Sequence, residues 1–389
     1  MNILGISGAI GWDGNIPYDL GDLIGDPWVH GSGATLIMDG ELKNAICEER
    51  FSRIKYDGNY PKLVIQHILD FNKLTKHDID LVLYVCGASP INFEVKMSGY
   101  IESKLQEYFP NSTVEYVSHH AAHTAATFFT SGFDEANIFT FDGCGDPELQ
   151  NNEEWKVVHA KFSYGKDMTL SEIKSFHIAE PPMSTSFGNL YSAFSHQVYE
   201  KKMSLVNVDA KTDPINRETY PGKIMGLSAY GNHRNVDLPD WFSLERDKQK
   251  YSNGEWKDCL PYLVSSPEYE SSTSNTTNDL NPDDLAAWLQ HQFEKHLLNW
   301  LSNIPESIKS DNLCLGGGSA LNILTNSKII EQGIYKNVHV NTAPNDDGLH
   351  FGAALLGSAE KERKVILPED IGYLGITYTD EEIEKIITS

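Results

Sequence analysis

A unit of strand, glycine-containing turn, strand and strand occurs twice in this chain, and this repeat limits the folds that the chain can adopt. The apolar segments of the first copy lie at residues 2–9, 33–38 and 42–49, and those of the second lie at residues 137–142, 155–163 and 170–178. Helical segments are predicted after each copy, at residues 61–72, 92–109 and 186–200. Although three-strand meanders are common, the repeat predicts an α/β fold with two duplicated lobes.

Length and charge narrow the class of protein. The 389 residues are too many for one ordinary hydrophobic core and enough for two domains or lobes. An apolar content of 40% and a charged content of 22% are typical of a soluble globular protein. The formal net charge of −24, from 31 basic and 55 acidic residues, argues against nucleic acid or an anionic membrane as the main partner, because both need a basic surface.

The cysteines and the first residues indicate a cytoplasmic location. The five cysteines are scattered and contain no C-x-x-C pair, which is typical of a reducing compartment. The N-terminal segment enters an apolar strand without a basic region before it, so no signal peptide is predicted. No apolar run reaches the length of a membrane span.

The strongest chemical signal is the pair His119 and His123. Residues four apart lie on one face of a helix, where two imidazoles can bind one metal ion, although such a pair alone is more often two unrelated surface histidines. Asp346 is the candidate third ligand, because two imidazoles and one carboxylate leave positions open for substrate at catalytic Fe or Zn. The alternative for Asp346 is to cap a helix that starts at Gly348.

Four glycine-containing turns follow apolar strands. They begin at Gly8, at residues 142–146, at residues 315–322 and at residues 345–349. Glycines between a strand and a helix let the backbone approach a phosphate or an adenosine closely. One such turn is weak evidence, since tight turns need glycine anyway, but four in a duplicated lobe favour a nucleotide bound in a cleft. The chain has no P-loop motif.

Two further segments have open interpretations. His30, just before the second strand, is either a general base or a solvated loop histidine. Lys55 ends a run of mixed charge at residues 48–55 and either faces a phosphate or belongs to a solvated surface.

A surface loop is predicted at residues 265–281, followed by a helix that starts at Pro282. The buried stripe of this helix is predicted to consist of Leu285, Trp288, Leu289, Phe293, Leu297 and Trp300.

Taken together, these motifs resemble the O-carbamoyltransferases of antibiotic and nodulation-factor biosynthesis. Those enzymes share their main domain with the universal tRNA threonylcarbamoyltransferase and belong to the actin-like ATPase-fold, or ribonuclease H-like, superfamily. The matching stretches follow the family's order and lie at residues 5–8, 30–34, 39–40, 48–55, 118–123, 141–146, 186–192, 222–231, 313–322 and 346–355.

The resemblance implies two duplicated lobes with a cleft between them. The N-terminal lobe is expected at residues 1–134, with an insertion at 11–29. The C-terminal lobe is expected at 135–375, with a loop region at 232–281, and residues 376–389 form a remnant linker or tail.

The resemblance also implies roles for individual residues. His119, His123 and Asp346 would bind a divalent metal, with iron expected first, zinc as the alternative and magnesium as a further candidate, and this metal would polarise the carbamoyl group of carbamoyl-adenylate. His30 would be the base that deprotonates the acceptor, and Lys55 a cation near the reacting group. The AMP part would be held by Asp142, Gly143, Gly145, Gly316, Gly317, Gly318, Ala320 and Asn322.

This chain departs from the family in three places. The insertion at residues 11–29 is expected to reshape the acceptor pocket. The segment after His30 reads His-Gly-Ser-Gly where the family usually has His-Asp-Ser-Ser, and Trp28 stands where an acidic residue is frequent. Family members continue into a second domain that makes carbamoyl-adenylate from ATP and carbamoyl phosphate, whereas here residues 373–382 resemble the linker to it. The resemblance therefore implies a separate adenylate-forming protein as a partner.

The leading hypothesis is a cytoplasmic, metal-dependent carbamoyltransferase that acts on a hydroxyl or amine of a small-molecule natural-product intermediate. One alternative is an ATPase or kinase of the actin-like fold. Another is a non-catalytic scaffold or binding subunit of a biosynthetic complex. The sequence names neither the acceptor nor the oligomeric state, for which a homodimer is one expectation.

Overall fold

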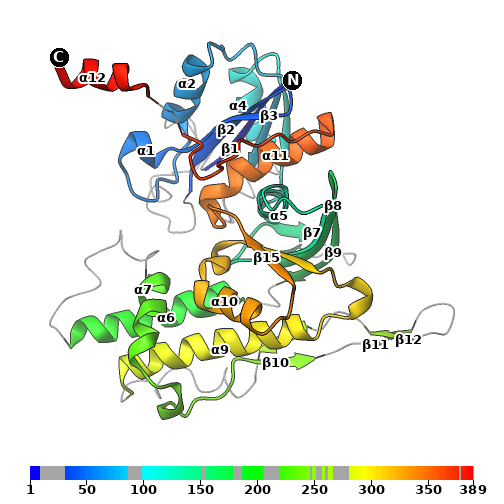
Figure 1. Ribbon diagram of the computed structural model, residues 1–389, viewed down its shortest axis with the longest axis vertical. Helices are drawn as coiled ribbons and strands as arrows, with labels where there is room; N and C mark the ends of the chain where they lie inside the picture. The colour runs from blue at the N-terminus through cyan, green and yellow to red at the C-terminus, as the bar shows by residue number, and fades with distance from the viewer. Residues whose placement is uncertain are drawn as a thin grey trace. The chain divides into compact units, whose positions relative to one another are not determined.

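The computed structural model describes residues 1–8, 31–85, 99–149, 155–177, 186–205, 220–245, 248–250, 256–258, 262–265, 280–375 and 378–388. The described chain divides into two compact units. The first comprises Met1–Ala126 together with Asp347–Ser389, and the second comprises Thr127–Asp346. Each unit contains a mixed β-sheet with helices packed on it (Figure 1).

The first unit is built on a five-stranded sheet. Its strands are β1 (Asn2–Ser7), β2 (Gly33–Met38), β3 (Glu41–Cys47), β4 (Leu81–Val85) and β5 (Thr113–Tyr116). The strand order is β3-β2-β1-β4-β5, with β2 antiparallel to both β1 and β3, and with β4 parallel to both β1 and β5. The turn between β2 and β3 has positive φ angles at both Asp39 and Gly40, as a tight hairpin requires.

Helices cover both faces of this sheet. The helices of the first unit are α1 (Glu49–Ser52), α2 (Lys62–Phe71), α4 (Tyr100–Tyr108), α5 (His119–Phe129), α11 (Leu349–Glu362) and α12 (Asp380–Thr388). Leu4 and Ile6 of β1 form a core with apolar residues of α2 and α4. Gly5 faces the other way, and α11 lies against β1 there so closely that a Cβ at Gly5 would sit 2.2 Å from the carbonyl oxygen of His350. Strand β1 is therefore buried on both faces, which explains its nearly continuous apolar sequence.

The second unit repeats the topology of the first. Its main sheet contains β6 (Glu135–Phe141), β7 (Pro147–Leu149), β8 (Trp155–Lys166), β9 (Thr169–His177), β14 (Asn312–Gly316) and β15 (Asn337–Val340). Strand β6 is antiparallel to β8, β8 is antiparallel to β9, and β14 is parallel to both β6 and β15. Strand β6 thus corresponds to β1, the pair β8 and β9 to β2 and β3, and the pair β14 and β15 to β4 and β5. The predicted duplication is confirmed, and with it the actin-like class of α/β fold.

The helices of the second unit pack against this sheet. They are α6 (Phe187–Ser204), α7 (Tyr220–Leu227), α9 (Pro282–Ser302) and α10 (Ile323–Glu331), joined by the short 3₁₀ helices η4 (Ser228–Tyr230), η5 (His233–Asn235), η6 (Glu306–Ile308), η7 (Gly318–Leu321) and η8 (Asp346–Gly348). The predicted helix at Pro282 is confirmed, because Asn281 caps α9 by accepting a hydrogen bond from the Asp283 N–H at 2.8 Å. All six residues of its predicted stripe are at most 3% exposed.

The predicted loop region 232–281 contains regular structure. Two small antiparallel sheets form there, one from β10 (Phe242–Glu245) and β13 (Tyr262–Ser265), the other from β11 (Lys248–Lys250) and β12 (Trp256–Asp258). Most of the predicted surface loop at 265–281 lies outside the described residues, as does the insertion at 11–29.

The units differ from the expected lobes in their bounds. Residues 127–134 were expected to belong to the first lobe but lie in the second unit. Residues 347–375 were expected to belong to the second lobe, but they pack within the first unit. The reason is the packing of α11 on β1, β2 and β4, where Ala354 lies against Gly5 and Gly357 lies against Ile3 and Leu83.

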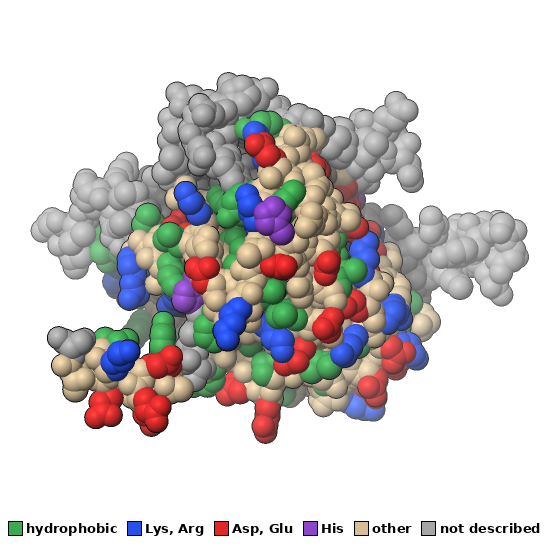
Figure 2. Space-filling model, turned by 90° about the horizontal axis from the view of Figure 1, so that it is seen from above, with side chains coloured by type: hydrophobic (Ala, Val, Ile, Leu, Met, Phe, Trp, Pro, Cys, Tyr) green, Lys and Arg blue, Asp and Glu red, His purple; other side chains and the backbone are tan. Residues whose placement is uncertain are grey.

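Charge is distributed rather than concentrated on the face that Figure 2 shows. Acidic and basic side chains alternate over the described part of that face, with apolar and uncharged groups between them.

In the described part of the chain, none of the helices combines the length and apolar character that crossing a membrane would need.

The contact of α11 with β1 yields a stability prediction. A methyl group at Gly5 would meet two backbone atoms, the His350 carbonyl oxygen at 2.2 Å and the Ala354 nitrogen at 2.8 Å, so Gly5→Ala must force α11 away from the sheet. We expect a loss of about 1–3 kcal/mol in the free energy of unfolding, measured by urea denaturation. The matched control is Gly222→Ala in α7, where a Cβ meets nothing within 4 Å. Equal stability of the two variants would contradict the packing.

Candidate metal centre

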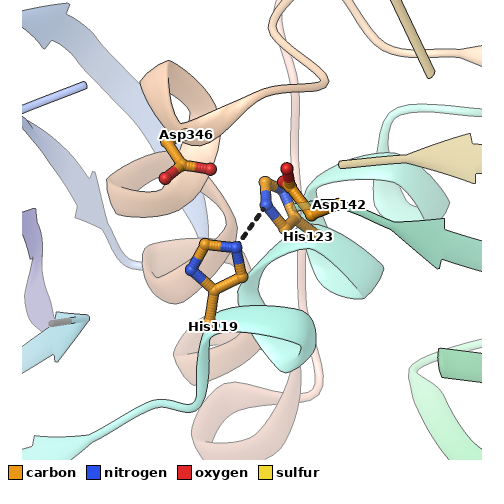
Figure 3. A group of neighbouring side chains, drawn as sticks. All are labelled: His119, His123, Asp142 and Asp346. Carbon is orange, nitrogen blue, oxygen red and sulfur yellow. Dashed lines mark hydrogen bonds between the residues drawn. The ribbon is translucent and has the colours of Figure 1, made fainter. Parts of the chain in front are cut away.

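The histidine pair lies on one turn of a buried helix. The alanine-rich sequence after Ser118 favours helix formation, and His119 is the first residue of α5. His119 and His123 are each 1% exposed, and their Nε2 atoms are 3.1 Å apart (Figure 3). Two nitrogen ligands about 2.1 Å from one ion lie about 3.0 Å apart in adjacent octahedral positions and about 3.4 Å apart in tetrahedral ones. The observed separation therefore suits two ligands of one ion.

Asp346 reaches the same place from the other end of the sequence. It begins η8, which leads directly into α11, and it is 6% exposed. Helix α11 packs on α5 at Gly352, where a Cβ would sit 1.9 Å from the carbonyl oxygen of Ala122. Only glycine permits this approach of the two backbones. The N-cap residue of α11 is Gly348, and the alternative role of Asp346 as a helix cap stays a prediction.

Asp142 is a fourth member of the group. It follows the last residue of β6, and its carboxylate accepts hydrogen bonds from the backbone N–H groups of Gly143 at 2.7 Å and of Gly318 at 2.8 Å. One ligand atom from each of His119, His123, Asp142 and Asp346 lies within 4.8 Å of the others, and Figure 3 shows the four side chains directed toward a common space.

The composition of this group fits a divalent metal. Two carboxylates held so close together repel each other, and a dication between them with two neutral imidazoles removes that cost. Two nitrogen and two oxygen donors are a set that iron and zinc both accept. Sequence reasoning placed Asp142 with the nucleotide, which stays a prediction, and did not include it among the candidate metal ligands. The available signal was an acidic residue at the end of the central strand of the second repeat.

Two motifs hold the backbone of Asp142 in place. Ser186 caps α6 and donates its hydroxyl to the Asp142 carbonyl oxygen at 2.6 Å. Gly188 lies against the same turn, where a Cβ would sit 2.5 Å from the Gly143 nitrogen. Gly317 packs on Phe141, the residue before Asp142, because a Cβ at Gly317 would be 2.3 Å from the Phe141 carbonyl oxygen. The glycines of both motifs thus permit close backbone packing around Asp142.

The two turns that were expected to bind the nucleotide, at residues 142–146 and 315–322, lie next to each other. Their backbone N–H groups, however, donate hydrogen bonds to other groups of the protein. The Gly145 N–H donates to the Val158 carbonyl, the Gly317 N–H to the Pro344 carbonyl and the Ala320 N–H to the Gly317 carbonyl. Together with the N–H groups of Gly143 and Gly318, which bind Asp142, these donors stabilise the turns themselves. Contact of Gly143, Gly145, Gly316, Gly317, Gly318 and Ala320 with AMP stays a prediction.

Asn322 has an evident structural role. Its side chain and that of Gln290 in α9 exchange two hydrogen bonds, each 3.0 Å long, and its oxygen also accepts from the Thr325 N–H at 3.1 Å. Tyr191 of α6 donates its hydroxyl to the Gln290 oxygen at 2.9 Å. This buried network ties α6, α9 and α10 to the glycine turn, so the side-chain amide of Asn322 serves the turn. Its contact with AMP stays a prediction.

The two expected catalytic residues are placed differently. His30 lies outside the described residues. Lys55 is exposed in the loop after α1, with its Nζ 4.5 Å from the centroid of the Tyr56 ring. The charged run before it is not uniformly solvated, because Glu48 is 4% exposed and accepts hydrogen bonds from the N–H groups of Leu63 and Val64 at the start of α2. Burial raises the pKa of Glu48.

Comparison with known proteins gives relatives along most of the chain. An uncharacterized protein of Synechocystis is 27% identical over 412 aligned residues, which cover 92% of this chain and 61% of that protein. The nodulation protein NolNO of Sinorhizobium fredii is 26% identical over 389 aligned residues, which cover 92% of this chain and 50% of NolNO. The chain thus spans about half to three fifths of the length of these relatives.

Solved structures agree on the fold. HypF from T. kodakarensis superposes with a TM-score of 0.51 at 13% sequence identity, over 93% of this chain and 48% of HypF. At this identity the similarity shows a common fold and nothing more about activity. The family model described as the carbamoyltransferase N-terminus matches residues 95–355, which is more than half of the chain and includes all four residues of the metal group. The chain belongs to this carbamoyltransferase family.

Proposed function

We propose that the chain transfers a carbamoyl group from carbamoyl-adenylate to a hydroxyl, or alternatively an amine, of a small-molecule natural-product intermediate. Membership of the carbamoyltransferase family supports the class of reaction. The observation that carries the proposal is the group of His119, His123, Asp142 and Asp346, which converges from three separate segments of the chain. Iron is the metal we expect there, with zinc as the alternative.

The four candidate ligands indicate which chemistry a bound metal would supply. A divalent ion bound to them would act as a Lewis acid and polarise the carbonyl of the carbamoyl group. His119 and His123 would hold the ion as neutral imidazoles, and the backbone N–H groups of Gly143 and Gly318 keep the Asp142 carboxylate in one orientation. His119, His123 and Asp346 are buried, which would limit the access of water that competes with the acceptor for the donor.

The proposed transfer needs no reactant besides carbamoyl-adenylate and the acceptor. The acceptor oxygen or nitrogen attacks the carbamoyl carbon, the bond from this carbon to the phosphate oxygen breaks, and AMP leaves with the bonding electron pair. The acceptor proton passes to a base, for which His30 is our candidate, and Lys55 is the candidate cation near the leaving phosphate. The turns at residues 142–145 and 316–322 are the candidate site for the AMP part.

The other hypotheses are less well supported. An ATPase or kinase of the actin-like fold needs loosely bound magnesium and has no use for two buried histidines in the group. A scaffold has no use for four converging ligands. The source of carbamoyl-adenylate remains a proposal, with a separate adenylate-forming protein as the expected partner.

Metal content is the first prediction of this proposal. We expect one equivalent of iron or zinc per chain after purification without chelator, measured by elemental analysis, and its loss in both His119→Ala and Asp346→Asn, because each variant removes a ligand. His120→Ala is the matched control, since His120 is equally buried in the same helix but does not belong to the group. The metal proposal fails if the wild-type chain carries no metal, or if His119→Ala keeps it.

Turnover is the second prediction. Given chemically prepared carbamoyl-adenylate and a panel of hydroxylated and amino acceptors, the metal-loaded chain should release AMP and a carbamoylated product, followed by chromatography and mass spectrometry. Loss of the metal in His119→Ala should lower this rate by about 100-fold or more, the range for removing one transition-state stabilising group.

The same assay tests the donor source. With ATP and carbamoyl phosphate in place of carbamoyl-adenylate, we expect no product from the purified chain alone. Product formation under those conditions would remove the need for an adenylate-forming partner, whereas acceptor-independent ATP hydrolysis would favour the ATPase hypothesis instead.

A further inference from the structure

His350 lies one helical turn after Asp346, and its ring is inserted into the first sheet. It is 2% exposed, and its Nδ1 is 2.7 Å from the hydroxyl of Thr35 in β2. Its Nε2 is 3.9 Å from the thiol sulfur of Cys47 at the end of β3, and the same sulfur lies 3.7 Å from the Asp347 carbonyl oxygen. The ring therefore contacts the strands beneath α11.

The buried ring of His350 is uncharged. Burial lowers the pKa of His350 to about 3, against a smaller opposing effect of a hydrogen bond to the Asp347 carbonyl, so the ring is neutral. A neutral imidazole has one N–H and one acceptor nitrogen. Nδ1 shares a hydrogen bond with the Thr35 hydroxyl, and the ring also makes a hydrogen bond to the backbone of Asp347. His350 thus connects β2 to the backbone of the residue directly after Asp346.

The sheet provides a space for this ring. A Cβ at Gly33 would lie 2.3 Å from His350 Nε2 and 2.7 Å from the Ile46 carbonyl oxygen, so a larger residue there would displace the imidazole. Thr35, two residues along the same strand and on the same face, is completely buried and supplies the hydroxyl. The space left free at Gly33, next to the buried hydroxyl of Thr35, therefore accommodates the imidazole of His350.

We propose that His350 is a positioning residue for Asp346. By bonding to Thr35 and to the Asp347 carbonyl, it fixes the first turn of α11 and so the direction from which the Asp346 carboxylate approaches the metal. His350 itself is not among the residues of the metal group. The inference rests on the proposed metal-binding function and extends it to a residue outside the metal group.

The test uses Co²⁺, whose visible absorption reports the geometry of its ligands. Thr35→Val removes the hydroxyl at nearly constant volume, and Thr35→Ser retains it. We expect Thr35→Val to raise the dissociation constant for Co²⁺ by about tenfold or more, the range for residues that orient metal ligands, and to change the Co²⁺ absorption bands. Thr35→Ser should behave like the wild-type chain.

A matched control separates positioning from general loss of stability. Thr130→Val removes a Thr–His hydrogen bond of 3.0 Å, between Thr130 and His339, which does not involve α11. It should leave Co²⁺ affinity and absorption unchanged. His350→Gln is the second variant and should weaken Co²⁺ binding as Thr35→Val does, with the melting temperature of each metal-free variant measured in parallel.

Each outcome has a distinct meaning. If the wild-type chain binds Co²⁺ and both Thr35→Val and His350→Gln bind it with the same affinity and absorption, the positioning role is wrong while the metal site stands. If Thr130→Val weakens Co²⁺ binding as much as Thr35→Val does, the effect is not specific to His350 and the proposal is overturned. If the wild-type chain binds no Co²⁺, the proposed metal site fails, and the role of His350 fails with it.

Discussion

The close packing of α11 on the first sheet and on α5 is the contact on which the candidate site depends. It requires glycine at Gly5 and at Gly352, because a side chain at either position would collide with backbone atoms of the facing element. The helix covers the first sheet, follows directly after η8, which begins with Asp346, and inserts His350 beside β2. The residues that bury the sheet therefore also set the position of a candidate metal ligand.

The sequence was sufficient for features with a local signal. The strands of both repeats, the helix from Pro282 and its buried stripe follow from periodicities that any short window shows, and the structure confirms them. The spacing of His119 and His123 predicted one helix face, which α5 confirms. The structure also brings Asp346 to the same group, while the metal-binding role of these residues stays a proposal. The confirmed predictions depend on the order of residues within a few turns.

Features that depend on distant partners could not be predicted from the sequence. Residues 347–375 were assigned to the lobe that precedes them, since no local pattern shows that α11 returns to β1. The glycines around Asp142 gave no sign that the backbone N–H groups of Gly143 and Gly318 would donate to its carboxylate, because Gly318 is 176 residues away. The hydrogen-bonded pair of Asn322 and Gln290 joins positions 32 residues apart, and no local sequence pattern at either position predicts the other as its partner.

One departure from the family pattern acquires a physical reason. The segment that reads His-Gly-Ser-Gly places Gly33 where the family usually has serine, and a Cβ at this position would overlap the His350 ring. Gly33 and His350 are 317 positions apart in the chain, but they occupy complementary volumes. A change at one position thus constrains the other.

The discontinuity of the first unit has a consequence for the order of folding. Its sheet is complete in the chain by Tyr116, but the helix that covers β1, β2 and β4 begins only at Leu349. During synthesis the whole of the second unit leaves the ribosome before the first sheet receives this cover. The apolar face of the sheet at Ile3 and Leu83 is therefore uncovered while more than 200 further residues are synthesised. An apolar surface that is exposed for this long is one to which a chaperone is expected to bind.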